Sequence, residues 1–289
     1  MIIVKFAGGL GNQLFQYSFA TYLSKKLNES VYIDTSWYRT KLRDLHIESL
    51  GLGCSYFDEK SMEKIVYRES KIFNLLDKIG VYGSSKIINH YEETFDLEAF
   101  LKSNRSSKDY HFFHGWWAKK EYVDAFMEEK KVNCFSNKET YQYWIKKITS
   151  NKESVSIHIR RADYINNQDI FKILTKQYYL DSLDFISLKL NRPKIYIFSD
   201  DIQWCKSNFS GPYYFVSDGT LTDLEEFDLM SKCRHNIIAN STFSWWAAKL
   251  NEFKEKIIVM PLIWFNNPEF QDLYKNGTSV LSTLSSYKL

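Results

Sequence analysis

The chain has few cysteines, and their spacing excludes the common cysteine-based sites. Only four occur in 289 residues, and no two of them form a Cys-x-x-Cys pair. Zinc-binding and thiol-redox motifs therefore lack support. Isolated thiols of this kind are typical of buried cysteines in a reducing compartment. The four are Cys54, Cys134, Cys205 and Cys233.

Strong net charge and long apolar segments are also missing. The formal net charge is +3, from 38 basic and 35 acidic residues. This balance argues against a nucleic-acid partner and is compatible with weak contact with an anionic membrane surface. Residues 6–24 are uncharged, but Asn12, Gln13 and several glycines make them unsuitable as a transmembrane helix. Because the apolar run of residues 2–4 is too short for a secretory signal, we expect a cytoplasmic protein.

Proline is scarce too, and it is confined to one half of the chain. All four prolines lie between Pro193 and Pro268. A length of 289 residues favours two domains, since single hydrophobic cores rarely grow larger. The charged segment of residues 146–154 is the expected linker. We therefore expect domains at residues 1–150 and 151–289.

The hydrophobic pattern predicts an α/β protein. Residues 2–34 are predicted to form a β-α-β unit. A run of β-branched residues is followed by a glycine-rich turn, by apolar residues at helical spacing and by a second β-branched run. Residues 35–109 show no clear organisation. The second half alternates between strands and helices, which predicts a doubly wound parallel sheet. Its expected strands are residues 155–160, 194–198, 213–216, 236–239 and 256–260.

The most informative segment is residues 158–163, His-Ile-Arg-Arg-Ala-Asp, at the end of a predicted strand. Side chains alternate along a strand, so His158 and Arg160 are expected on one face. Guanidinium groups stay charged and can donate paired hydrogen bonds to phosphate oxygens. Ligands of open α/β sheets lie beyond the carboxyl ends of the strands. The segment therefore indicates a phosphorylated small molecule, unless Arg160 and Arg161 are a surface pair beside a buried strand.

A glycine-rich turn lies where a dinucleotide-binding fingerprint would lie. Leu14 replaces the third glycine of Gly-x-Gly-x-x-Gly, so an NAD site is disfavoured. Gly9 and Gly11 still let a ligand approach the backbone at a helix N-terminus. The amides of Asn12 and Gln13 suit sugar hydroxyls. The alternative is a tight turn that closes a strand onto a helix.

Two carboxylates, Asp200 and Asp201, follow the strand expected at residues 194–198. Three roles are open for them. Oxygen ligands suit Mg²⁺ or Mn²⁺, although adjacent side chains diverge on an extended chain. A carboxylate can also accept hydrogen bonds from the N1–H and amino groups of guanine. Finally, Ser199 or Asp200 can cap the next helix.

Hydroxyl side chains follow the strand expected at residues 236–239 and begin a helix. Ser241, Thr242 and Ser244 can cap this helix and, with its free N–H groups, line a phosphate. The adjacent Trp245 and Trp246 are expected to pack inside the protein. Three strand ends with Arg, Asp and Ser/Thr chemistry in one half together predict a nucleotide-diphosphate pocket.

Taken together, these segments resemble glycosyltransferase family 11, the α-1,2-fucosyltransferases, in its bacterial branch. They occur in the family's order, and His-x-Arg-Arg-x-Asp is shared with related fucosyltransferase families. The pair Ala118-Lys119 departs from a frequent Gln-Ser, which concerns the acceptor more than the donor, and Leu262-Ile263 replaces an often lysine-rich pair. The matching stretches are residues 8–17 (GGLGNQLFQY), 115–122 (GWWAKKEY), 158–164 (HIRRADY), 199–201 (SDD), 240–247 (NSTFSWWA) and, more loosely, 261–265 (PLIWF).

The resemblance implies a GT-B-type fold, with two Rossmann-like domains facing each other across a cleft. Residues 1–150 would be the acceptor side, and residues 151–289 would bind GDP-β-L-fucose. It implies an inverting transfer of fucose to a galactoside 2-hydroxyl, with no cofactor and no metal requirement. The acceptor would be a galactose-containing oligosaccharide or lipid-linked glycan in O-antigen or H-type glycan synthesis. Peripheral contact with the inner face of the inner membrane is compatible with such an acceptor.

The same resemblance implies roles for individual residues. Arg160 would hold the β-phosphate and stabilise the departing GDP, and His158 would contact the ribose or diphosphate. Asp163 is a candidate base unless it pairs with an arginine, and Arg161 would bind the donor or brace its loop. The remaining assignments are Asp200 or Asp201 for guanine, Ser241, Thr242, Ser244, Gly9 and Gly11 for the donor, and Asn12, Gln13, Trp116 and Trp117 for the acceptor side.

Two other functions stay open at the level of sequence. One is a transferase that uses a different nucleotide sugar or makes a different fucose linkage. The other is a non-catalytic sugar-binding protein that keeps the fold. The presence of His158, Arg160 and Asp163 argues against the second.

Overall fold

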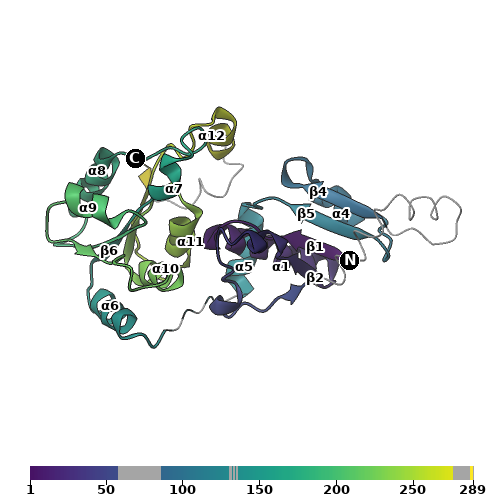
Figure 1. Ribbon diagram of the computed structural model, residues 1–289, viewed down its shortest axis with the longest axis horizontal. Coiled ribbons are helices and arrows are strands. Elements are labelled where there is room, and N and C mark those ends of the chain that lie inside the picture. Colours follow the sequence, from purple (N-terminus) through teal and green to yellow (C-terminus); the bar gives the residue numbers. More distant parts are fainter. Residues whose placement is uncertain (58–85, 130–131, 133, 135, 276–286, 289) are drawn as a thin grey trace, which may run out of the picture. The chain divides into compact units, whose positions relative to one another are not determined.

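The computed structural model describes residues 1–57, 86–129, 132, 134, 136–275 and 287–288, in two compact units (Figure 1). The first unit spans Met1–Lys131 and the second Val132–Leu289, so the division precedes the expected residue 150. Helix α6 (Glu139–Thr149) belongs to the second unit, because its Tyr141 hydroxyl donates a hydrogen bond to Asp228. Residues 146–154 consequently lie inside the second unit, as the end of α6, a short connection and the first residue of the next strand, rather than as a linker between the units.

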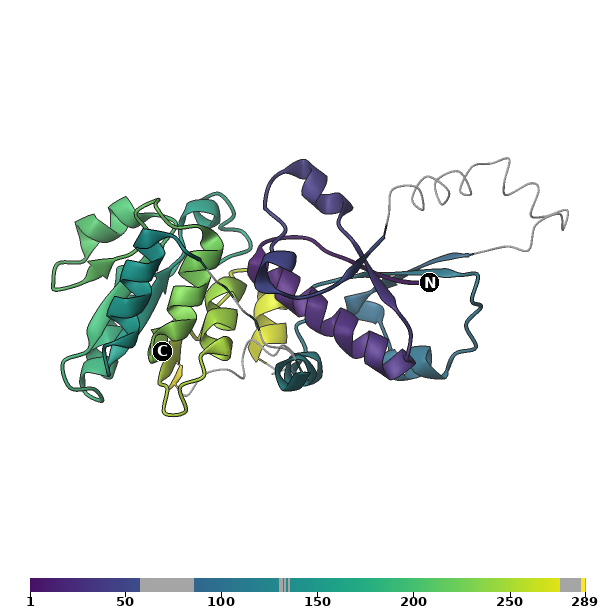
Figure 2. The ribbon, with the colours of Figure 1, turned by 90° about the horizontal axis from the view of Figure 1, so that it is seen from below.

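The first unit contains a parallel sheet with the strand order β3-β2-β1-β5-β4 among its described residues. The predicted β-α-β unit is confirmed, since helix α1 (Leu10–Leu27) connects β1 to its parallel neighbour β2. Figure 2 shows α1, the long purple helix, alongside these strands. The strands are β1 (Ile2–Lys5), β2 (Val31–Asp34), β3 (Ser55–Tyr56), β4 (Ile87–Tyr91) and β5 (Tyr110–His114).

Aromatic side chains hold α1 against the rest of the first unit. The Phe19 ring lies 5.5 Å from Phe113 of β5, 4.0 Å from Trp117 and 5.0 Å from Tyr122. Tyr122 belongs to α5 (Lys120–Glu129), which packs on α1. Short elements occupy the described part of the stretch whose organisation was not predicted. They are the 3-10 helices η1 (Ser36–Thr40), η2 (Glu48–Leu50) and η3 (Glu92–Thr94), and helix α4 (Leu97–Lys102).

The second unit contains a parallel sheet with the order β11-β10-β9-β6-β7-β8 in the described part of the chain. Counted along the chain from β6, this is the 3-2-1-4-5-6 order of doubly wound nucleotide-binding sheets. The doubly wound prediction is therefore confirmed. The strands are β6 (Ser154–Ile159), β7 (Lys194–Ser199), β8 (Tyr214–Phe215), β9 (His235–Ile237), β10 (Ile258–Met260) and β11 (Tyr287–Lys288).

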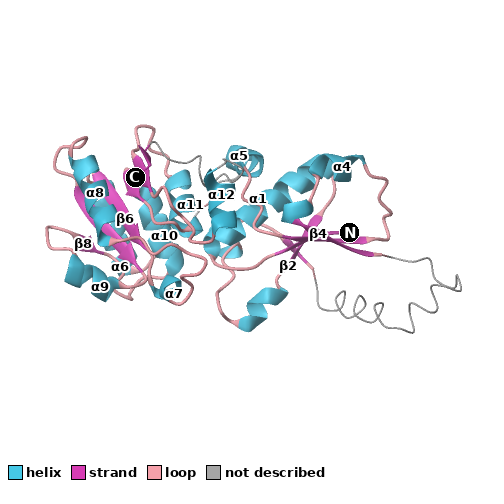
Figure 3. Ribbon diagram, turned by 90° about the horizontal axis from the view of Figure 1, so that it is seen from above, coloured by secondary structure: helices cyan, strands magenta, loops and turns pink. Residues whose placement is uncertain are grey.

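Helices cover both faces of this second sheet (Figure 3). On one face, Val155, Ile157 and Ile159 of β6 join a core with buried residues of α8 and α9. On the other, His158 lies 5.6 Å from the Phe243 ring of α11. None of the described helices combines the length and apolarity needed to cross a bilayer. The helices are α6, α7 (Ala162–Ile165), α8 (Lys176–Ser187), α9 (Ile202–Asn208), α10 (Asp223–Lys232), α11 (Thr242–Leu250) and α12 (Pro268–Lys275).

Candidate active site

The strand order of the second unit places a topological switch point at the carboxyl ends of β6 and β9. These strands are neighbours, but the chain continues from β6 toward one edge of the sheet and from β9 toward the other. Such a switch point is where open α/β sheets bind ligands. The segments that follow the two strands meet there, since the buried Tyr164 hydroxyl donates to the Asn240 carbonyl oxygen at 2.8 Å. The structure thus brings together residues 160–163 and 240–244, as the sequence predicted.

Arg160 lies at this switch point between two carboxylates. Its Nη2 donates to Asp163 Oδ2 at 2.6 Å, and its Nη1 lies 3.2 Å from Asp200 Oδ2. Burial opposes the charge, but the two carboxylates outweigh it and raise the pKa of Arg160. A guanidinium carries five N–H donors, so two such contacts leave donors for a phosphate. Arg160 is therefore a charged, oriented and partly exposed group at the switch point.

His158 is buried beneath this arginine and is uncharged. Burial, with a smaller effect of Arg160, lowers the pKa of His158 to about 3. The side chain is 4% exposed, and its Nδ1 has no hydrogen-bond partner among the described residues. The imidazole cannot supply positive charge to a diphosphate at neutral pH. The contact of His158 with the ribose or diphosphate stays a prediction, and it would be a hydrogen bond rather than an ion pair.

The second arginine of the pair braces the loops. The Arg161 guanidinium lies 4.0 Å from the centre of the Trp204 ring, and its Nε lies 3.3 Å from Asp201 Oδ2. Stacking and pairing of this kind orient the side chain toward α9 rather than toward the switch point. Of the two alternatives for Arg161, the structure favours bracing over donor binding.

Asp200 and Asp201 connect the ends of β6 and β7. Asp200 accepts hydrogen bonds from the backbone N–H groups of Arg161 and Ala162 at 2.9 and 3.2 Å. Asp201 caps α9, because its side chain accepts from the Trp204 N–H at 3.2 Å. Capping therefore occurs, but by Asp201 rather than by Ser199 or Asp200. These contacts occupy both carboxylates and weaken the case that either recognises guanine.

The N-terminus of α11 lies after β9, next to Tyr164 and its contact with Asn240. Ser241 holds the N-cap position without a capping side-chain hydrogen bond. The first N–H groups of a helix have no intrahelical acceptor and favour an anion. Ser244 points back instead, and its hydroxyl lies 3.5 Å from the Ala239 carbonyl oxygen and 3.3 Å from that of Ser241. Ser241 and the half-buried Thr242 thus suit a phosphate better than Ser244, and Trp245 and Trp246 are buried as predicted.

Sequence reasoning missed a carboxyl group in the second unit. Glu226 of α10 accepts a hydrogen bond from the Ser217 hydroxyl at 2.7 Å, and Ser217 Oγ accepts from the Ser199 N–H at 3.0 Å. Burial raises the pKa of Glu226 to about 7, with help from acidic neighbours that include Asp200. Glu226 therefore lies near the carboxyl ends of β7 and β8. An acidic residue in the first turn of a helix gives no distinguishing sequence signal.

The glycine-rich turn of the first unit contains one correction. Gln13 is fully buried, donates to the carbonyl oxygens of Asp44 and Gly8, and accepts from the His46 N–H at 2.8 Å. It fixes a loop and is not accessible to a sugar, so its assignment to the acceptor side is wrong. Asn12, the preceding residue, is half-buried. Gly9 caps α1 and Gly11 lies in its first turn, and their contact with a donor stays a prediction.

The adjacent Trp116 and Trp117 have different surroundings. Trp117 is fully buried and stacks on Phe19, with the ring planes 9° apart. Trp116 is 51% exposed. The acceptor-side prediction is therefore wrong for Trp117, which is a core residue, and stays a prediction for Trp116.

Comparison with known proteins identifies the chain. The family model described as glycosyl transferase family 11 matches residues 1–278. The chain belongs to this family. It is a glycosyltransferase, as the resemblance implied, and the switch point of the second sheet is its candidate nucleotide-sugar site.

Relatives of this family 11 glycosyltransferase match over almost its whole length. It is 31% identical to an alpha-1,2-colitosyltransferase of Escherichia coli, over 93% of this chain and 94% of that protein. It is 30% identical to the O-antigen biosynthesis glycosyltransferase WbnK of Escherichia coli, over 90% and 93%. A crystal structure of POFUT1 in complex with GDP-fucose shares the fold, with a TM-score of 0.54, 13% identity and coverage of 89% and 97%. The two-domain GT-B-type fold class is thereby supported.

Two further features of this glycosyltransferase bear on ligands. Among the described residues, no group of three or more His, Cys, Asp or Glu side chains could hold a metal ion, and metal independence itself stays a prediction.

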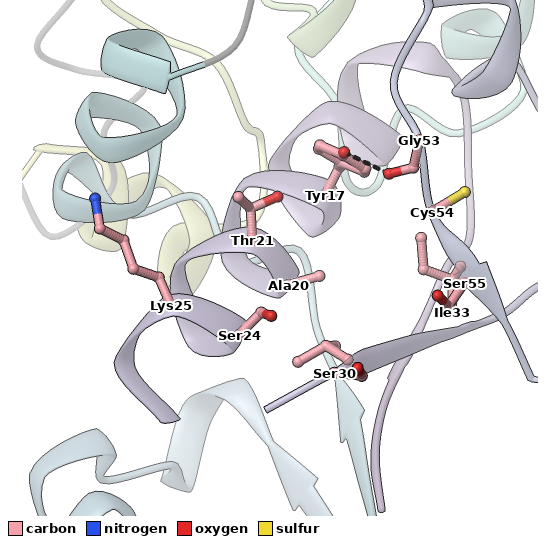
Figure 4. A pocket seen from close by; sticks show the side chains of 11 residues that line it. Tyr17, Ala20, Thr21, Ser24, Lys25, Ser30, Ile33, Gly53, Cys54 and Ser55 are labelled. Carbon is pink, nitrogen blue, oxygen red and sulfur yellow. Dashed lines mark hydrogen bonds between the residues drawn. The ribbon is translucent and has the colours of Figure 1, made fainter. Parts of the chain in front are cut away.

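A hollow of about 480 Å³ lies between α1 and the β2–β3 edge of the first unit (Figure 4). Hydroxyl groups line much of it, and the Tyr17 hydroxyl donates to the Gly53 carbonyl oxygen at 2.8 Å. None of the predicted site residues lines this hollow.

Proposed function

We propose that this glycosyltransferase transfers L-fucose from GDP-β-L-fucose to the 2-hydroxyl of a galactoside with inversion. The observation that carries the proposal is the oriented guanidinium of Arg160 at the switch point of a nucleotide-binding sheet. The family supports it, because the two whole-length relatives are named for α-1,2 transfer of colitose and for O-antigen biosynthesis. Residues 1–131 would then bind the acceptor, and residues 132–289 the donor.

Arg160 is the group proposed to stabilise the leaving nucleotide. When the bond between the sugar C1 and the phosphate breaks, negative charge accumulates on the GDP β-phosphate. A preplaced donor stabilises this charge without reorganising during the reaction, which is usually the largest catalytic contribution. The N–H groups at the start of α11, beyond Ser241, would share this charge. Asp163 already pairs with Arg160, so its role as orienting partner is favoured over that of a base.

Glu226 is proposed to recognise guanine. The base presents an N1–H and an amino group, which suit an ionised carboxylate acceptor. Asp200 and Asp201 are engaged with backbone N–H groups, whereas the side-chain hydrogen bond of Glu226 involves Oε2 and the Ser217 hydroxyl. Its pKa of about 7 means that binding of N–H donors would also drive its ionisation.

A donor and acceptor panel tests the proposal. The protein is incubated with GDP-fucose, GDP-colitose, GDP-mannose or UDP-galactose and with a set of β-galactosides, and the linkage of each product is determined by NMR. Turnover with GDP-fucose and an α-1,2 linkage are expected, with little change when EDTA is added. Turnover with the UDP-sugar alone, or the absence of transfer from every donor, would overturn the proposal.

A second donor, GDP-colitose, is the alternative favoured by a particular observation. The relative that is 31% identical over 93% of this chain is named as a colitosyltransferase. Colitose is fucose without its 3-hydroxyl, so the two donors share the GDP group and differ in a single sugar contact. A kcat/KM ratio above one for GDP-colitose over GDP-fucose would select this alternative. The acceptor proposed in both cases is a galactose-containing glycan, free or lipid-linked, and peripheral membrane contact stays part of the proposal.

A further inference from the structure

Glu92 makes a pair of contacts that the sequence did not predict. It lies in η3, directly after β4. Its Oε2 accepts hydrogen bonds from the backbone N–H groups of Trp116 at 2.7 Å and Trp117 at 2.8 Å. One carboxylate oxygen thus fixes two consecutive peptide groups. Charge-assisted hydrogen bonds of this kind are stronger than neutral ones.

The turn that Glu92 holds has an unusual backbone. Trp117 has a φ of 59°, in the left-handed region that non-glycine residues rarely adopt. At Gly115, an added Cβ would lie 2.5 Å from Glu92 Cβ and 2.8 Å from its Oε2, so only glycine fits beside the carboxylate. The Gly115 carbonyl also accepts from Gln16 Nε2 at 3.1 Å. The conformation of this turn therefore depends on its partners, since such a backbone costs energy.

The consequence of this turn is that two consecutive indoles point in different directions. Trp117 enters the core, and Trp116 remains half exposed. The Trp116 ring lies over Gly8, where an added Cβ would approach Trp116 Cζ3 at 3.2 Å and Asn12 Nδ2 at 2.6 Å. An exposed indole face next to a side-chain amide suits a sugar, whose C–H face packs on the ring while its hydroxyls bond the amide.

We propose that Glu92 is a positioning residue that holds Trp116 as the stacking surface for the acceptor sugar. The inference rests on the proposed function, because it assigns the acceptor to the first unit. Glu92 itself does not touch the substrate. It acts through the Trp116 and Trp117 peptide groups, and its removal would let the turn relax so that the indole loses its fixed orientation.

Kinetics of Glu92→Ala, Trp116→Ala and the double variant test this inference. Each single variant is expected to raise the acceptor KM by about tenfold, and the double variant no more than Trp116→Ala alone. The KM for GDP-fucose and the rate of donor hydrolysis are expected to match those of the unchanged protein. The matched control is Glu93→Ala, which removes the neighbouring exposed carboxylate and is expected to change neither KM.

Additive effects in the double variant would overturn the inference, as would an acceptor KM in Glu92→Ala within about twofold of the unchanged protein. An equal rise in the donor KM would also overturn it, because a general loss of structure affects both substrates. If Glu92→Ala does not fold, Glu92→Gln serves instead. Its neutral amide oxygen accepts from the same two N–H groups more weakly than the carboxylate, so a rise of about threefold is expected in the acceptor KM alone, and an unchanged acceptor KM would overturn the inference. Absence of turnover in the unchanged protein would instead refute the proposed function.

Discussion

In the second unit, an arginine held by two carboxylates lies where the strands end, whereas an exposed indole and a side-chain amide lie beyond the ends of strands in the first unit. Both units are parallel sheets flanked by helices. Arg160, Asp163 and Asp200 follow β6 and β7, while Asn12 and Trp116 follow β1 and β5. The same architecture therefore supplies two kinds of surface. The fold provides the position, and the residues after each strand determine which ligand can bind there.

The difference extends to how each surface is kept in place. In the second unit, carboxylates hold a guanidinium and a backbone turn, so the orienting contacts are themselves charged. In the first unit, ring stacking and the amides of Gln13 and Gln16 contribute beside the carboxylates of Glu92 and Asp34, which accept from backbone N–H groups. Charge suits a nucleoside diphosphate, whereas rings and amides suit an uncharged sugar. The comparison predicts that variants in the two units change different kinetic parameters.

The largest expected effect lies in the pair of tryptophans of the first unit. Trp117→Ala removes a fully buried indole stacked on Phe19, and large-to-small core changes of this size cost about 3–5 kcal/mol. Trp116→Ala is expected to change stability by less than about 0.5 kcal/mol, because that ring is half exposed. Urea unfolding followed by circular dichroism measures both. Similar unfolding midpoints for the two variants would remove the distinction between a core indole and a ligand-facing one.

The next effect concerns the guanidinium of the second unit. Arg160→Lys keeps the charge but loses the planar fork, and kcat is expected to fall by about 10²–10³-fold while the fold is retained. The acceptor KM should stay close to its original value. Arg161→Lys is the matched control, because that side chain stacks on Trp204, and its kcat is expected to fall far less. Equal losses in the two variants would show that the pair acts as a structural unit and that Arg160 has no special role.

Prediction from sequence was more successful in the second unit, and the reason is physical. Strands buried on both faces give continuous apolar runs, and here they alternate regularly with helices. The strand bounds predicted between residues 154 and 260 therefore lie close to the observed ones. In the first unit, the sheet contains the two-residue strand β3 and an edge strand, β4, whose side chains are mostly half-buried or exposed. Strands with so little buried surface leave a weak hydrophobic pattern. Some of the unpredicted stretch, residues 58–85, lies outside the described residues.

The candidate site was predicted only in part for a related reason. Residue type indicated that Arg160 and the α11 N-terminus follow strands, and the structure has them after the neighbouring strands β6 and β9, while their contact with a ligand stays a prediction. Residue type could not reveal which side chains turn inward, and Gln13, Trp117 and Ser244 all do. It also could not distinguish Glu226 from Glu225, since the two differ only in what surrounds them in three dimensions. Burial and hydrogen-bond partners are properties of the fold and leave no local trace.

Glu225 and Glu226 provide the last test, with the smallest expected effect, of how the second unit binds the nucleotide. Burial opposes ionisation of Glu225, but hydrogen bonds from Ser136, Thr222 and Lys138 outweigh it and lower the pKa of Glu225 to about 2. Burial raises the pKa of Glu226 to about 7. If Glu226 binds guanine as a carboxylate, the KM for GDP-fucose should fall as the pH rises through 7. Glu226→Gln should raise this KM by about tenfold at pH 8 and remove its pH dependence.

The same pair predicts opposite changes in stability. A carboxyl whose pKa is raised on folding contributes stability below its ordinary pKa, and that stability is lost as the pH rises through 7. Glu226→Gln is therefore expected to raise the thermal unfolding temperature at pH 8, with a smaller gain at pH 5. Glu225 has a lowered pKa and stabilises the fold above its ordinary value, so Glu225→Gln should lower the unfolding temperature at pH 8. A lowered unfolding temperature at pH 8 in both variants would show that ionised Glu226 stabilises the fold, which contradicts a pKa raised by burial.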